Sequence, residues 1–151
     1  MPYPEQLEIK QKNEEELLGR LGKVERIIGM RYPCFYRNKV TAAFGKDKKG
    51  NIICGTYSEG THYIVQVDKC LIEDEKCQEI IRTVKSLLKG FKMEPFNEDT
   101  GKGLLRHVLV RRGIKTGEIM VVLVLGTHMF PSGNNFVKEL LKLHPEISTV
   151  V

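Results

Sequence analysis

The chain contains no tryptophan, and its 151 residues include only four cysteines and six prolines. The cysteines, at positions 34, 54, 70 and 77, form no C-x-x-C pair, so neither a zinc ribbon nor a dithiol redox motif is indicated. No apolar run approaches the roughly 18 residues that a transmembrane helix requires. Charged residues interrupt the first segment at Glu5, Glu8 and Lys10, which argues against a secretory signal. We therefore expect a cytoplasmic protein.

The common nucleotide-binding and catalytic motifs are also missing. Gly101 and Gly103 flank a single lysine, but a strand is predicted to follow them where a phosphate-binding loop needs a helix. No glycine-rich dinucleotide fingerprint follows a strand, and no serine or cysteine occupies a nucleophile elbow. His62 and His107 lie nearest the basic segments, yet no carboxylate has a motif spacing that would orient either ring. This pattern favours surface or hydrogen-bonded histidines over catalytic ones.

Positive charge is what the sequence does contain, with 24 lysines and arginines against 19 acidic residues. The basic residues gather at positions 31–39, 46–49 and 106–115, on predicted strands and turns. The first of these segments interleaves aromatic residues with cations, a pattern in which rings stack on unpaired bases while cations hold phosphates. The alternative is a solvated set of charges that protects a sheet edge. The aromatic spacing favours nucleic acid.

Hydrophobic periodicity predicts three helices and six strands. A first helix is expected from Pro4 to about Arg26, although Gly19 and Gly22 favour a bend or an early end. Two further helices are predicted at 74–90 and 134–143, and strands at 36–44, 51–57, 63–67, 104–112, 118–125 and 147–151. Hairpins mixed with two helices of similar length predict an α+β fold: a mainly antiparallel sheet with two helices packed on one face, plus an N-terminal appended helix.

The strand at 104–112 alternates apolar residues with four basic ones, Arg106, His107, Arg111 and Arg112. Since a hairpin can bury one face and leave the other in water, we expect these cations on the wet face. Cations in such a place need an acidic partner, and in a basic chain that partner is usually phosphate.

Several ordered motifs resemble the middle of bacterial RNA uracil-C5 methyltransferases. They are Tyr-Arg-Asn-Lys at 36–39, the segment 64–72, Gly-Leu-Leu-Arg-His at 103–107 with Arg111 and Gly113, and Thr-Gly-Glu at 116–118. The subgroup is the type that modifies 23S ribosomal RNA and carries an iron–sulfur cluster. The first residues, Tyr3–Leu7 with Lys10 and Gln11, look like the helix that follows this family's cysteine cluster. The resemblance runs nearly end to end and implies a central-domain fragment.

In the full enzyme, the resemblance implies an N-terminal RNA-binding barrel, a [4Fe-4S] segment, this central domain and a C-terminal Rossmann-like domain. That last domain would hold S-adenosylmethionine, the catalytic base and a cysteine that attacks C6 of a flipped-out uracil before C5 takes the methyl group. No catalytic or cofactor-binding residue of the family maps onto this chain. We therefore expect the fragment to be inactive and to bind neither S-adenosylmethionine nor the cluster.

The resemblance also implies a division of the chain. Residues 1–30 would be an N-terminal helix that packs on the catalytic domain of the parent enzyme. Residues 31–151 would be the RNA-binding and cluster-supporting domain, cut at its C-terminus because the apolar pair Val150 and Val151 ends the chain within a predicted strand. Exposed leucines of the first helix could pair two copies of the excised piece into a dimer.

By the same resemblance, Cys70 matches the fourth iron–sulfur ligand, and the other three ligands would lie upstream of the chain. The remaining cysteines match no cluster position, and a buried structural thiol is the alternative for Cys70. Ribosomal RNA is the expected partner, not DNA or a membrane, and the residues expected to contact it are Arg37, Lys39, Arg106, His107 and Arg111. Two alternatives to this function remain: a free-standing α+β RNA-binding module, and a structural spacer between domains whose cations are merely solvated.

Overall fold

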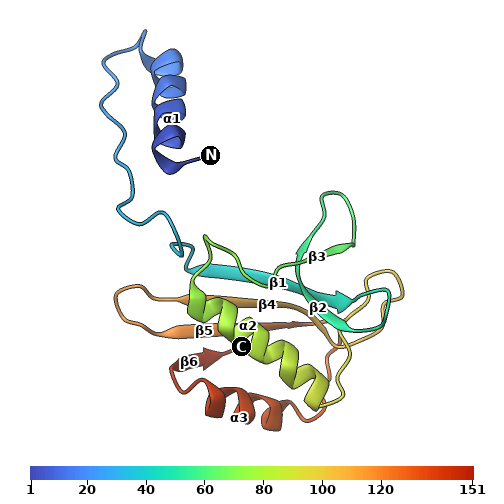
Figure 1. The fold of residues 1–151 in the computed structure, drawn as a ribbon. Helices are drawn as coiled ribbons and strands as arrows, with labels where there is room; N and C mark the ends of the chain where they lie inside the picture. The colour runs from blue at the N-terminus through green and yellow to red at the C-terminus, as the bar shows by residue number, and fades with distance from the viewer. The chain divides into compact units, whose positions relative to one another are not determined.

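A single six-stranded sheet dominates the computed structural model, which describes residues 1–151 (Figure 1). Neighbouring strands are antiparallel except for the parallel pair β5–β6, and the order across the sheet is β3-β2-β1-β4-β5-β6. This arrangement confirms the predicted α+β class and both predicted hairpins, β1–β2 and β4–β5. The strands are β1 (Lys39–Lys46), β2 (Ile52–Tyr57), β3 (Ile64–Gln66), β4 (Leu105–Arg112), β5 (Ile119–Leu125) and β6 (Ile147–Val150).

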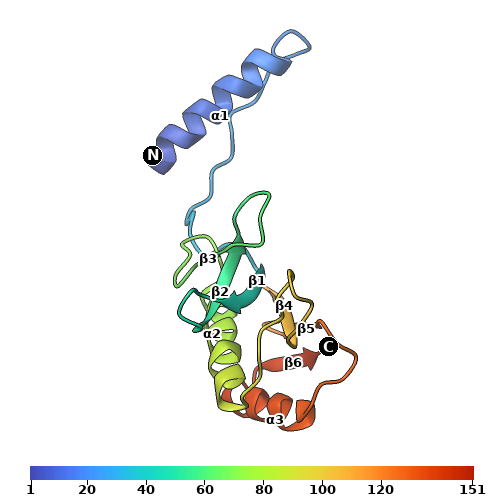
Figure 2. The same ribbon diagram turned by 90° about the vertical axis from the view of Figure 1, so that its right-hand side faces the viewer.

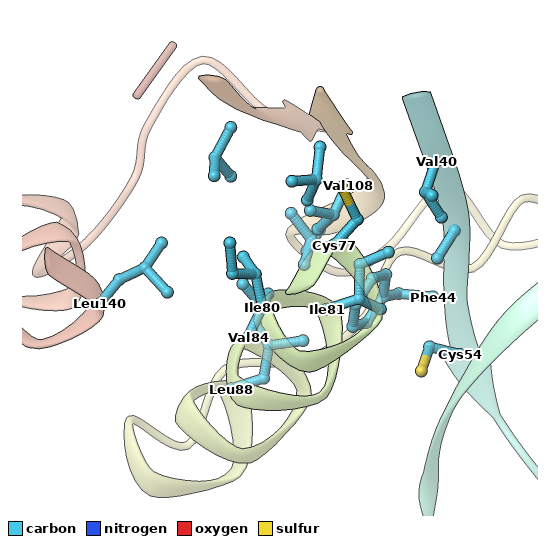
Figure 3. Close-up of a cluster of buried hydrophobic side chains, with 14 of the residues drawn as sticks. Val40, Phe44, Cys54, Cys77, Ile80, Ile81, Val84, Leu88, Val108 and Leu140 are labelled. Carbon is cyan, nitrogen blue, oxygen red and sulfur yellow. The ribbon is translucent and has the colours of Figure 1, made fainter. Parts of the chain in front are cut away.

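Helices α2 (Glu75–Gly90) and α3 (Gly133–Leu143) pack side by side and cover one face of the sheet (Figure 2). Each is amphipathic, so its apolar side meets the apolar side of the strands. Figure 3 shows Ile80 and Val84 of α2 between Leu140 of α3 and the strand residues Val40 and Phe44. The core therefore lies between the two helices and β1, β4 and β5. Neither α2 nor α3 covers the opposite face of the sheet, which is called the open face below.

The start of α2 is fixed by Asp74, as the sequence predicts. Its carboxylate accepts hydrogen bonds from the backbone N–H groups of Lys76 and Cys77, which satisfies two donors that a helix leaves unpaired. Its second oxygen lies 3.1 Å from the guanidinium of Arg112. Arg112 thus lies toward the helices and not on the wet face of β4, because its place in the alternation is that of the buried Val108 and Val110.

Residues Met1–Cys34 form a separate unit. Helix α1 (Tyr3–Leu18) ends well before the predicted Arg26, since the chain turns at Gly19 and then runs back along the helix. Gln11 holds the returning segment through the N–H of Ile27 and the carbonyl of Glu25. None of the residues in α1 is buried, and no helix of the chain combines the length and apolar character needed to cross a bilayer.

Candidate nucleic-acid interface

The open face of the sheet carries two unpaired cations side by side. Lys39 in β1 is directly opposite Arg111 in β4, and both side chains are exposed. Directly opposed residues have Cα atoms about 5 Å apart, and like charges in such pairs destabilise a sheet. No carboxylate forms an ion pair with either residue, whereas the neighbouring Arg106 and Arg112 both have acidic partners. An external anion would relieve this repulsion.

The sequence predicts Arg106 as an unpaired cation, but in the structure it has an acidic partner. A register shift between Leu105 and His107 interrupts the alternation of β4 at this residue. Its Nε and Nη2 atoms donate to the two carboxylate oxygens of Glu98 at 2.9 and 3.0 Å, and its guanidinium lies 5.2 Å from the centre of the Phe96 ring. Arg106 is therefore charge-compensated and serves to hold the loop that carries Glu98.

His107 lies on the same face as Arg111 but four residues away along β4, opposite Ala43. Its ring meets the edge of the Tyr57 ring at a centroid distance of 5.8 Å. Burial lowers the pKa of His107, and the positive charge of Arg106 lowers it further. The imidazole is therefore neutral near pH 7 and offers a phosphate a hydrogen bond at most, without a full charge.

Arg37, the fifth predicted contact, lies beside the start of α2. Its backbone N–H donates to Ile72 and its carbonyl accepts from the N–H of Asp74. Burial raises the pKa of the half-buried Glu73, and the exposed guanidinium of Arg37 opposes that rise only in part. Of the five predicted residues, the structure thus brings together Lys39 and Arg111, while Arg37 and Arg106 each lie near a carboxylate.

Cys70 lies in the loop between β3 and α2, and its backbone is held from both sides by one buried side chain. The amide of Gln78 accepts from the N–H of Cys70 and donates to its carbonyl, at 2.9 and 2.8 Å. Cys70 as a whole residue is half-exposed. By contrast, burial raises the pKa of Cys54, and it raises that of Cys77 to about 12, so both stay protonated. No three potential metal ligands gather anywhere in the chain.

Two features of the surface escaped the sequence analysis. Arg82, Lys85 and Lys89 follow one another at helical spacing along α2 and, with Lys46 and Lys92, line a groove of about 640 Å³. The helical spacing of these cations is the sequence signal for that row, whereas the basic segments described above lie on strands and turns. The second feature is a hydrogen-bond contact between His62 Nδ1 and Asp99 Oδ1 at 2.9 Å. Their separation of 37 positions leaves no motif for a sequence to display.

The chain is similar in sequence to proteins described as RNA methyltransferases. The chain is 44% identical over 138 residues to a protein from Clostridium acetobutylicum described as an uncharacterized RNA methyltransferase, a match that covers 87% of the chain. A protein from Halalkalibacterium halodurans with the same description is 36% identical over 156 residues and covers the whole chain. The chain spans 30% and 34% of the lengths of these two relatives. No family model matches the chain.

The fold leads to the same group of proteins. The crystal structure of a tRNA (uracil-54, C5)-methyltransferase from Pyrococcus abyssi, in complex with S-adenosyl-L-homocysteine, superimposes with a TM-score of 0.74 and 28% sequence identity. The match covers 90% of this chain and 32% of that enzyme. By sequence and by fold, the chain is therefore related to a segment of RNA methyltransferases, among them a uracil-C5 enzyme.

Proposed function

We propose that this chain is the RNA-gripping central segment of an S-adenosylmethionine-dependent uracil-C5 methyltransferase that acts on 23S ribosomal RNA in the cytoplasm. The kinship with RNA methyltransferases supports an RNA partner. The motifs shared with the ribosomal subgroup, from Tyr36 to Lys39 and from Gly103 to His107, support the choice of substrate. The segment holds the RNA while catalysis is carried out by residues outside it.

The observation that carries the proposal is the opposed pair Lys39 and Arg111. A sheet that served only as a spacer would gain stability from an acidic residue at either position, because opposite charges across strands attract. The chain instead keeps two cations there without a carboxylate partner. Phosphate binding is the function that two such unpaired cations serve, since each phosphate contact releases condensed counterions from the RNA.

Replacing Lys39 with glutamate tests this surface without endangering the fold. Because the new carboxylate would face Arg111, we expect the free energy of unfolding to stay constant or rise slightly. We expect the affinity for a transcribed 23S RNA domain to fall about tenfold, and the slope of log affinity against log salt to become shallower by about 1. Fluorescence anisotropy across a salt series measures both quantities.

The matched control is Lys138→Glu, which makes the same change of charge on the exposed surface of α3. It should lower RNA affinity much less, because α3 lies on the face of the sheet away from Lys39. If both substitutions lowered RNA affinity equally, the affinity would depend only on the net charge of the chain. An unchanged affinity in the Lys39→Glu variant would show that the open face does not contact RNA.

We further propose that Cys70 supplies one ligand of an iron–sulfur cluster. Gln78 fixes its backbone and the residue is only half-buried, which suits a ligand more than a packing residue. A [4Fe-4S] cluster requires four thiolates, and the residues of this chain do not provide them, because Cys54 and Cys77 are buried thiols and no metal-binding group forms. The other ligands must then come from residues outside the chain.

The chain alone is expected to transfer no methyl group to RNA. A uracil-C5 methyl transfer needs a thiolate nucleophile beside a bound methyl donor, and the family resemblance places both the nucleophile and the donor site outside this chain. Within the chain, burial raises the pKa of the Cys54 and Cys77 thiols. The measurement is incorporation of radiolabelled methyl groups from S-adenosylmethionine into uracil-containing RNA. Incorporation above the level of a sample without protein would overturn this part of the proposal.

A further inference from the structure

A cavity of about 660 Å³ opens at the end of the sheet where the β1–β2 turn, the start of β3 and the loop 95–99 meet. Its size falls within the range of sites that hold small molecules. Aromatic rings gather at its wall: the Tyr57 ring lies 6.2 Å from that of His62, and Phe96 and the 66% exposed Tyr63 also line the cavity. The site therefore offers flat apolar surfaces to a planar ligand.

One of these rings, that of His62, is held in place by a polar contact. Asp99 Oδ1 lies 2.9 Å from Nδ1 of His62, which fixes the orientation of that imidazole. The loop that carries Asp99 is in turn closed by Asn97, whose side-chain oxygen accepts from the N–H groups of Asp99 and Thr100. A ring that is already oriented loses less conformational entropy when a ligand stacks on it.

Each carboxylate that lines the cavity already has a hydrogen-bond or ion-pair partner. Glu98 binds Arg106, Asp99 contacts His62, and Asp47 accepts from the backbone of its own turn. On that turn, Lys48 and Lys49 line the cavity and form no ion pair. A ligand that contacts both the aromatic rings and these two lysines would carry a planar polar ring with a negative group close to it.

We propose that this cavity binds one unpaired nucleotide of an RNA strand, with its base against His62 and Tyr63 and its phosphate beside Lys48 and Lys49. The inference rests on the proposed function, because it assumes an RNA partner, and it adds a second contact at the opposite end of the sheet from Lys39. Stacking on aromatic rings and cationic contact with phosphate are the two interactions by which proteins hold single-stranded nucleic acid.

Nuclear magnetic resonance of the isotope-labelled chain tests the site directly, with three small probes: uridine, uridine monophosphate and inorganic phosphate. We expect uridine and uridine monophosphate to shift the ring signals of His62 and Tyr63. The amide signals of Lys48 and Lys49 should shift with uridine monophosphate and with phosphate. If phosphate alone reproduces every shift, the cavity is only an anion site, and if no probe shifts the rings, the base site does not exist.

Binding of an unstructured oligouridine gives the second measurement. Tyr63→Ala should weaken binding about fivefold or more, and Tyr63→Phe should restore it, because phenylalanine keeps the stacking surface. The control, Met129→Ala, removes another exposed apolar side chain, which lies outside the cavity, and should leave the affinity for oligouridine unchanged. Full affinity in the Tyr63→Ala variant would refute the site. That result is distinct from failure of the proposed function, in which Lys39→Glu leaves affinity for the ribosomal RNA unchanged.

Discussion

Gly103→Ala is expected to destabilise residues 35–151 by about 2–4 kcal/mol. Gly103 has a φ of +107°, a conformation that residues with a Cβ atom rarely adopt. An added Cβ would also lie 2.1 Å from the carbonyl oxygen of Pro95, a backbone atom that cannot rotate away. Since the hydrogen bonds from Leu104 to Glu94 and from Phe96 to Leu105 hold the same two segments together, relief of the clash must separate them.

Gly101→Ala is the matched control for this substitution. Gly101 also has a positive φ, at +66°, but nothing lies within 4 Å of an added Cβ. We therefore expect Gly101→Ala to lower the free energy of unfolding by about 1 kcal/mol, through backbone strain alone. Urea unfolding followed by circular dichroism measures both variants, a suitable method because the chain has no tryptophan. If both variants lost the same free energy of unfolding, the clash between the added Cβ and Pro95 would contribute nothing to the destabilisation.

The Gly103 variant should also disturb the candidate site. The segment that Gly103 approaches continues through Phe96 and Asn97 to Glu98, the partner of Arg106. If that segment moves away from β4, the ion pair opens and the cavity beside His62 loses part of its wall. This links the stability of one backbone contact to the shape of the proposed nucleotide site.

Phe136→Ala is expected to cost about 3–5 kcal/mol of unfolding free energy. The ring is only 1% exposed and lies 5.5 Å, centre to centre, from the rings of both Phe91 and Phe130. Truncation would leave a cavity between α3 and the end of α2, and it would remove two aromatic contacts together. Leucine at this position should recover part of the loss, because it refills some of that volume.

Leu141→Ala provides the comparison on the same helix. Leu141 is 36% exposed, and alanine is the better helix former, so we expect a loss well below that of Phe136→Ala. The same urea titrations measure these variants. A Phe136→Ala protein as stable as the wild type would mean that α3 does not depend on this ring for its packing on the sheet.

Local patterns placed most of the elements correctly. The helix predicted from Asp74 to Gly90 is found at Glu75–Gly90 with Asp74 as its N-cap, because capping and amphipathic spacing are properties of consecutive residues. The first helix is predicted too long, to about Arg26, because Leu21 and Val24 fit a helical period that the two glycines interrupt. Tertiary packing does not stabilise helical turns beyond Leu18, since no residue of α1 is buried.

The roles of the cations could not be predicted in the same way. The sequence places Arg106, Arg111 and Arg112 together on the wet face of one basic strand and predicts RNA contact for Arg106 and Arg111. In the structure, Arg112 binds Asp74, which is 38 positions away, and Arg106 binds Glu98 across a turn, so only Arg111 is left without an acidic partner. Spacing along a strand tells which face a residue occupies, but not which acidic groups the fold brings to that face.

The sequence by itself determined the α+β architecture, the two hairpins, the helix cap at Asp74 and the concentration of positive charge, because each of these arises from interactions between near neighbours in the chain. Only the tertiary structure decided which charges are free, which cysteines are buried, and that Asp99 orients His62 beside Tyr57. Those properties depend on contacts between residues far apart in sequence, and they exist only once the strands have paired.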